Sequence, residues 1–205
     1  MTDTLLSMDN VQRYYETPAG TVKALDGVSF QIQEGERVIL LGPSGSGKTT
    51  LLNCLSALDS PTGGIYTFLG EKVPRNHSEK MTSFRRENIG YVFQFFNLLQ
   101  DLTVLENILL IQELAGKKDP VRAKELLGLV GLDAEVNRFP GEISGGQQQR
   151  VAIARSIAKR PTFLLGDELT GNLDTETSNK VMEALVSACK QENITSVFVT
   201  HDEGL

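Results

Sequence analysis

The sequence predicts an α/β fold: a parallel sheet preceded by antiparallel β-structure and interrupted by helices. A short apolar run over 37–41 leads into a glycine-rich stretch and then into leucines at helical spacing, as a buried parallel strand followed by a helix would. A second apolar run over 163–165 ends in two carboxylates. Between these runs, residues 97–158 carry helix signals rather than strand signals.

Length and composition limit the class of protein. A chain of 205 residues forms one domain, or one domain with an insertion. The net charge of −6 argues against a nucleic-acid partner, because such proteins usually present a basic face. Cys54 and Cys189 lie far apart without metal-ligand spacing, so we expect buried free thiols. No apolar run approaches the length of a membrane span, and the first four residues lack the basic region of a signal peptide.

The N-terminal half alternates strand patterns with turn signals. Val28, Phe30 and Ile32 alternate with polar residues, which is the period of a half-buried strand. The elements expected here are β-structure over 4–32 with a turn at 18–20, a helix over 49–58, a strand over 65–69, a helix near 81–84 and a buried strand over 89–93.

The helical segment has clear start and stop signals. Thr103 and Glu106 form a capping box at the start of a helix that runs through Leu114. Asp119-Pro120 is an N-cap followed by proline at N1, and Gly131 closes that helix. A third helix follows Ser144, and strands return at 163–165 and 194–199. We therefore predict one domain over 1–205, with an α/β core of 1–96 and 159–205 and a helical subdomain of 97–158.

The glycine-rich stretch matches G-x-x-x-x-G-K-[ST], the phosphate-binding P-loop. Its glycines let backbone N–H groups fold around a polyphosphate, and the N-terminus of the following helix adds its dipole. Lys48 is placed to reach the β- and γ-phosphates, and the Thr49 hydroxyl suits Mg²⁺. The predicted nucleotide-binding residues are Gly42, Pro43, Ser44, Gly45, Ser46, Gly47, Lys48, Thr49 and Thr50.

Two further stretches complete the predicted chemistry. Asp167 ends an apolar strand and suits a role in holding Mg²⁺, which makes Glu168 the candidate general base or water-orienting residue. Ser144, Gly145, Gly146 and Gln147 form a second anion site, at which Ser144 caps the next helix. This site has no lysine of its own, so we interpret it as half a site that another molecule completes.

Together these residues resemble the ATPase subunits of ATP-binding cassette (ABC) transporters, over almost the whole chain. Beside the P-loop, the run 143–147 is similar to the family's LSGGQ signature and 171–174 to its D-loop. Gln94 resembles the glutamine of the Q-loop, and His201 resembles the switch histidine. The resemblance implies a P-loop NTPase core with an N-terminal antiparallel β subdomain and an inserted α-helical subdomain.

The resemblance also implies a head-to-tail dimer with two ATP molecules at its interface. Each ATP would lie between the P-loop of one copy and the signature of the other. Gln94 would ligate Mg²⁺ together with Thr49 and Asp167, His201 would contact the γ-phosphate, and Asp174 would act across the interface. Tyr15 falls where the family places the aromatic residue that stacks on adenine, with Tyr14 as the adjacent candidate.

Three stretches look like the subgroup of lipoprotein-release and macrolide or peptide export ATPases: 57–64, 91–99 and 169–174. The resemblance implies a separate integral membrane permease as partner, and a position on the cytoplasmic face of the membrane. The apolar run 95–99 would lie near the groove that receives a helix of that permease. Cargo cannot be inferred from this sequence.

Two departures and two alternatives complete the prediction. Leu169 stands where the family usually has proline, and the sequence ends at Leu205, four residues after His201, where relatives continue. We expect weaker ATPase activity than in a longer relative. A soluble ABC protein of translation or DNA repair is disfavoured because the chain carries one cassette and is acidic. A non-hydrolysing nucleotide-binding module is disfavoured because Lys48, Asp167 and Glu168 are all present.

Overall fold

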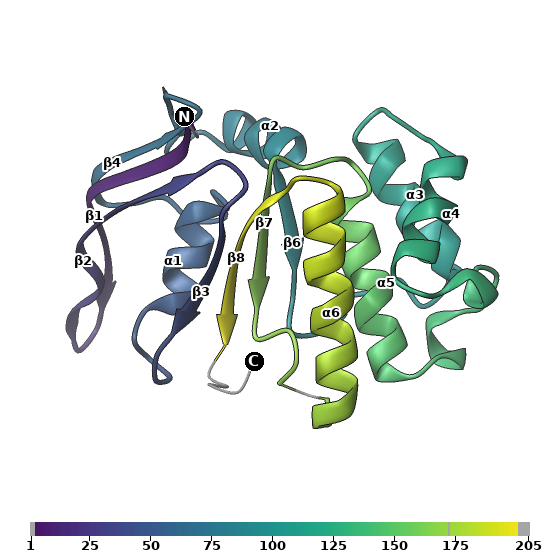
Figure 1. The fold of residues 1–205 in the computed structure, drawn as a ribbon. Coiled ribbons are helices and arrows are strands. Elements are labelled where there is room, and N and C mark those ends of the chain that lie inside the picture. Colours follow the sequence, from purple (N-terminus) through teal and green to yellow (C-terminus); the bar gives the residue numbers. More distant parts are fainter. Residues whose placement is uncertain (1–2, 172, 201–205) are drawn as a thin grey trace.

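The structure, a computed structural model, describes residues 3–171 and 173–200. An antiparallel sheet lies at one end of the molecule, a parallel sheet in the middle, and three helices (α3, α4 and α5) at the other end (Figure 1). The predicted α/β class with an N-terminal antiparallel part and inserted helices is confirmed.

The antiparallel sheet has the strand order β2-β1-β4-β5. The turn at residues 18 and 19 joins its two long strands, as predicted. The strands are β1 (Thr4–Thr17), β2 (Gly20–Gln33), β4 (Gly63–Phe68) and β5 (Glu71–Lys72).

The parallel sheet has the order β3-β8-β7-β6. Its strands are β3 (Arg37–Leu41), β6 (Ile89–Val92), β7 (Phe163–Asp167) and β8 (Thr195–Thr200). β7 is central, and its residues Phe163 to Gly166 are buried because both faces of the strand are covered.

The prediction that 37–41 is a buried strand was right about pairing and wrong about burial. β3 pairs in parallel with β8, but it is the edge strand of the sheet. Ile39 is 47% exposed and Leu41 is 56% exposed. Within the described residues, only one face of β3 is covered, and therefore its side chains alternate between half-buried and exposed.

The predicted helix starts and the predicted ends of α3 and α4 agree with the structure, whereas the predicted end of α1 does not. The helices are α1 (Lys48–Leu55), α2 (Ser78–Asn88), α3 (Val104–Leu114), α4 (Pro120–Leu129), α5 (Gly145–Ile157) and α6 (Thr175–Gln191), with short 3₁₀ turns η1 (Asp133–Glu135) and η2 (Pro140–Glu142). The capping boxes of α3 and α5 and the Asp119 cap of α4 are present. α1 stops before the predicted Leu58, because Ala57 adopts a left-handed φ of 54°.

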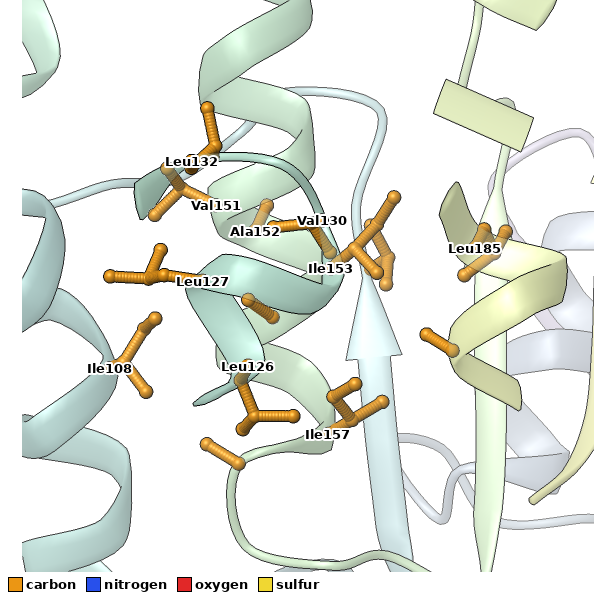
Figure 2. Close-up of a cluster of buried hydrophobic side chains, with 14 of the residues drawn as sticks. Ile108, Leu126, Leu127, Val130, Leu132, Val151, Ala152, Ile153, Ile157 and Leu185 are labelled. Carbon is orange, nitrogen blue, oxygen red and sulfur yellow. The ribbon is translucent and has the colours of Figure 1, made fainter. Parts of the chain in front are cut away.

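Two clusters of buried apolar side chains hold these layers together. The first, the helical cluster, lies among α3, α4, α5 and α6 and reaches the parallel sheet (Figure 2). Its members include Ile108, Leu126, Leu127, Ile153, Leu164, Leu169 and Leu185. The second, the sheet cluster, joins the antiparallel sheet through α1 to the other face of the parallel sheet, and includes Leu6, Leu52, Leu55, Tyr66, Phe163 and Leu165. β7 therefore contributes alternate residues to both clusters. Cys54 and Cys189 are buried free thiols, as predicted.

Candidate nucleotide site

The P-loop connects the end of β3 to the start of α1. Gly47 is the N-cap of α1, with a φ of 90°, and within the described chain no side chain caps the helix. A β-carbon on Gly47 would lie 2.5 Å from the carbonyl oxygen of Ala24. Only glycine fits here, and the first N–H groups of α1 are left without side-chain acceptors, as a phosphate site requires.

Lys48 lies at the mouth of this loop. Its Nζ donates hydrogen bonds to the carbonyl oxygens of Gly42 at 2.6 Å and of Pro43 at 2.8 Å. P-loop residues 44–50 line a cavity of about 460 Å³ together with Val22, Lys23 and Glu168. The ammonium and the candidate catalytic carboxylate thus belong to one site.

Asp167 meets the P-loop from the end of β7, two strands away from β3. The Thr49 hydroxyl lies within hydrogen-bonding reach of the Asp167 carboxylate. Burial raises the pKa of Asp167 above its ordinary value and the negative charge of Glu168 adds to this, while Thr49 and Lys48 oppose it. A cation placed between the hydroxyl and the carboxylate would relieve that unfavourable charge.

These two oxygen donors fit Mg²⁺. In the described part of the chain, no group of three or more His, Cys, Asp and Glu side chains could hold a metal by itself. Mg²⁺ is usually held by one or two protein ligands together with substrate phosphates and water, which is what Thr49 and Asp167 beside a P-loop provide.

Glu168 is held in an unusual conformation. Its φ is 45°, a left-handed value that is uncommon outside glycine and that occurs often at functional sites. Its N–H donates to the carbonyl oxygen of Val199 at 3.0 Å, and its carbonyl accepts from the N–H of Gly171 at 3.2 Å. A β-carbon on Gly171 would lie 3.4 Å from Nε2 of Gln94 and 3.9 Å from Oε2 of Glu168. The amide and the carboxylate therefore approach the same glycine, so the structure brings Gln94 to the site.

The signature residues form a second, separate site at the start of α5. Ser144 and Gln147 make a reciprocal capping box: Ser144 N donates to Oε1 of Gln147 at 2.9 Å, and Gln147 N donates to Oγ of Ser144 at 3.3 Å. Ser144, Gly146 and Gln147 line a cavity of about 300 Å³ with Arg150 and Lys180, whose positive charges suit an anion. The expectation that this site has no lysine of its own was wrong, because Lys180 reaches the cavity from α6. Gln147 has a structural role in this capping box, and the Ser-x-x-Gln spacing is the sequence signal for it.

Among residues 3–171 and 173–200, none lines both cavities. In Figure 1 the P-loop turn between β3 and α1 and the start of α5 lie at the same end of the strands but on opposite sides of β8 and β7. The structure therefore does not bring Ser144–Gln147 to the P-loop of the same chain.

The remaining predicted site residues are Asp174, Tyr15 and His201. Asp174 is the N-cap of α6 and accepts a hydrogen bond from Thr177 N at 3.0 Å. Tyr15 lies opposite Val22, which lines the P-loop cavity. His201 lies outside the described residues. Leu169, in the position of the family's proline, is buried within the helical cluster.

Sequence reasoning missed α6 and the contacts of two residues. The signal for α6 was present, because Asp174 is followed by Val181, Leu185 and Ala188 at helical spacing. No sequence pattern indicates the contacts of Asp59 and Thr177, which only the three-dimensional structure shows. Asp59 bonds to Tyr15, and Thr177 packs against Gly146.

A strand leads into a glycine loop and a helix N-terminus, and this loop shares one cavity with a glutamate that follows another strand of the same sheet. These features define a P-loop nucleoside triphosphatase. A family model described as ABC transporter matches residues 25–171. An ABC transporter ATP-binding protein of Thermotoga maritima is 47% identical over 97% of this chain and 86% of its own length. The lipoprotein-releasing system ATP-binding protein LolD of Geobacter metallireducens is 44% identical over 98% of this chain and 91% of its own. The chain spans only 40% of ABC transporter H family member 2 of Dictyostelium discoideum, at 45% identity.

Among solved structures, the dimer of MJ0796, a bacterial ABC transporter cassette, has a TM-score of 0.85 and 40% identity, covering 97% of this chain and 88% of that one. A second MJ0796 dimer, in a post-hydrolysis state with ADP and Pi, superposes equally well. This chain belongs to the ABC transporter family. It is an ATPase cassette whose cofactors are ATP and Mg²⁺.

Proposed function

We propose that two copies of this chain form a head-to-tail ATP-dependent dimer that drives a separate membrane permease, for export or lipoprotein release. The observation that supports a dimer is the separation of the P-loop cavity from the signature cavity. Because the two cavities of one chain lie apart, they cannot enclose the same nucleotide. Relatives named for lipoprotein release support the transport part. Within the described residues, no helix is long and apolar enough to cross a bilayer. In this proposal the dimer acts on its membrane partner from the cytoplasmic face.

In the proposed hydrolysis of ATP, each group of residues has a separate role. Backbone N–H groups of the P-loop and Lys48 bind the phosphates, and Glu168 accepts a proton from the water that attacks the γ-phosphate in line. Thr49, Asp167 and Gln94 would hold Mg²⁺, which would supply neutralisation of charge on the phosphate oxygens. Ser144, Gly145, Gly146 and Gln147 of the second copy complete the γ-phosphate site, with His201 on the first copy and Asp174 at the interface. Hydrolysis then depends on closure of the dimer, which moves the permease.

A groove between the α/β core and the inserted helices is suited to the permease. It has a volume of about 330 Å³ and is walled by apolar side chains, with three cations at its edge. Leu58, Phe93 and Leu114 line it and are 49%, 37% and 63% exposed. Exposed apolar residues gathered in a groove mark an interaction site rather than ordinary surface.

Leu114→Glu tests the permease assignment. We expect it to abolish capture of an integral membrane protein when the tagged chain is recovered from detergent-solubilised native membranes and bound proteins are identified by mass spectrometry. An apolar partner that docks over the groove would take the new carboxylate out of water, and this desolvation opposes docking. Val121→Glu is the matched control, because Val121 is 70% exposed on α4 and does not line the groove. Capture that survives Leu114→Glu, or that fails equally with both variants, would contradict the assignment.

Lys159, at the edge of the same groove, predicts a pH effect on stability. Burial lowers its pKa from the ordinary 10.5 to about 8, and Arg86 and Arg85 add to the shift. Between these two pH values the unfolded chain binds the proton and the folded chain does not, so folding stability rises with pH. We expect the Tm of the unmodified protein, measured relative to Lys159→Met, to rise between about pH 7.5 and about pH 9.5. A Tm difference that stays constant with pH would show that the ammonium is not destabilised in the fold.

A further inference from the structure

Two side chains of β1, Arg13 and Tyr15, meet Asp59, which follows α1 in the sequence. Oδ2 of Asp59 accepts hydrogen bonds from Nε of Arg13 and from the hydroxyl of Tyr15, both at 2.8 Å. The Arg13 guanidinium also lies over the Tyr15 ring, 4.3 Å from its centroid. The side chains of Arg13 and Asp59 are only 22% and 25% exposed, so solvent weakens these interactions less than at an open surface. The Tyr15 ring is therefore held at its edge by Asp59 and on one face by Arg13.

The carboxylate that holds Tyr15 is itself fixed to the end of α1. Asp59 N donates to the carbonyl oxygen of Asn53 in α1 at 3.0 Å, and Oδ1 of Asp59 accepts from Ser60 N at 2.7 Å. The opposite end of α1 is the phosphate site. The helix whose N-terminus forms the phosphate site therefore also fixes, through Asp59, the orientation of the Tyr15 ring.

Tyr15 is also close to the nucleotide cavity. It pairs with Val22 across the β1–β2 hairpin, and directly opposed residues of antiparallel strands project from the same face. Val22 lines the cavity that contains the P-loop. Lys23, which pairs with Tyr14, lines the same cavity. We therefore expect a base attached to phosphates at the P-loop to extend toward this part of the hairpin.

The neighbouring Tyr14 provides a contrast. Its hydroxyl donates to Asp26, and Lys23 lies 5.3 Å from its ring centroid. Lys23 and Asp26 are 58% and 53% exposed, so this second arrangement is an open surface pair that solvent screens. Only Tyr15 is held by a partly buried network.

We propose that Arg13 and Asp59 are positioning residues that hold the Tyr15 ring ready to stack on the nucleobase of ATP. Because Arg13 covers one face of the ring, the base uses the other. This inference rests on the proposed role of Tyr15 in stacking. Ordering the ring before the base arrives removes the entropy cost of fixing that side chain on binding, so the network raises affinity for the nucleoside part of ATP and leaves the phosphate part unchanged.

The test compares ATP with inorganic tripolyphosphate, which has the phosphates without the base. Binding of each ligand with Mg²⁺ is measured by isothermal titration calorimetry. Tyr15→Phe keeps the ring and removes only the hydroxyl, and Asp59→Asn keeps the Oδ1 acceptor for Ser60 while replacing Oδ2 with an NH₂ group that cannot accept. We expect each variant to weaken ATP binding by about 2- to 12-fold and to bind tripolyphosphate like the unmodified protein.

Two further variants make the outcomes distinguishable. Tyr15→Ala removes the ring and should weaken ATP binding by about 5-fold or more, the effect of losing a base–aromatic stack. Tyr14→Phe is the matched control, which should bind both ligands normally. If Tyr15→Ala binds ATP normally, the stacking role fails, and the positioning role fails with it. If only Tyr15→Ala weakens ATP binding, stacking stands and positioning by Asp59 is overturned. Equal loss of tripolyphosphate affinity in Asp59→Asn would overturn the proposal by showing that Asp59 acts through α1 on the phosphate site.

Discussion

Replacing Glu168 with glutamine should lower ATP turnover by about 10²- to 10⁴-fold, the typical contribution of a positioned general base. Glutamine keeps the shape of the side chain but cannot accept the proton of the attacking water. The P-loop, Lys48 and Thr49 are untouched, so ATP still binds. ATP should therefore accumulate in a stable dimer, which light scattering detects as a doubling of mass, while release of phosphate measures the lost turnover.

Glu183→Gln is the matched control for this experiment, because it makes the same change on the exposed surface of α6. It should leave both phosphate release and dimerisation unchanged. Near-normal hydrolysis by Glu168→Gln would remove Glu168 from the mechanism. A variant that binds ATP but stays monomeric would instead contradict the proposed head-to-tail dimer.

Gly146→Ala should destabilise the fold and disturb the contact between the start of α5 and α6. A β-carbon on Gly146 would lie 2.2 Å from Cγ2 of Thr177 on α6, far inside contact distance. Overpacking of this kind costs about 1–3 kcal/mol. We expect that loss in the free energy of unfolding measured by urea denaturation, together with loss of ATP-driven dimerisation in the Glu168→Gln background, because the start of α5 must shift.

A second substitution separates packing from ligand contact. Thr177→Ala removes the clashing methyl group, so the double variant should recover the unfolding free energy of Thr177→Ala alone. Gly145→Ala is the steric control, since its nearest side-chain atom is 3.5 Å away, and it should change stability by less than about 0.5 kcal/mol. If Gly146→Ala is as stable as the unmodified chain, the close approach of the two helices is not a constraint on the fold.

The features that sequence reasoning predicted well are local. A cap is made by residues three positions apart, so the caps of α3, α4 and α5 could be inferred from residue types alone. The P-loop is likewise a continuous stretch whose chemistry requires its glycines and lysine. Asp167 and Glu168 were proposed because an apolar run leads directly into two carboxylates in a chain that also has a P-loop, and their roles stay a prediction.

The features that sequence reasoning missed depend on what surrounds an element. The apolar run of β3 has the composition of a buried strand, but its burial depends on the neighbours that cover it, which the run does not encode. Arg13 and Asp59 are 46 residues apart, and no pattern links them. Thr177 has no motif of its own, and its contact with Gly146 arises only because α5 packs on α6.

The helical cluster also sets a rule for building chimaeras. Leu164 lies in β7, three residues before Asp167, and Leu169 directly follows Glu168; both belong to the cluster that α3, α4 and α5 complete. A β-carbon on the intervening Gly166 would lie 2.8 Å from Leu169, so this segment has little room to adjust. Any exchange of the inserted helices with those of a relative therefore replaces the packing that flanks the two carboxylates. Residues 164–169 should therefore be exchanged together with the helices, as one unit.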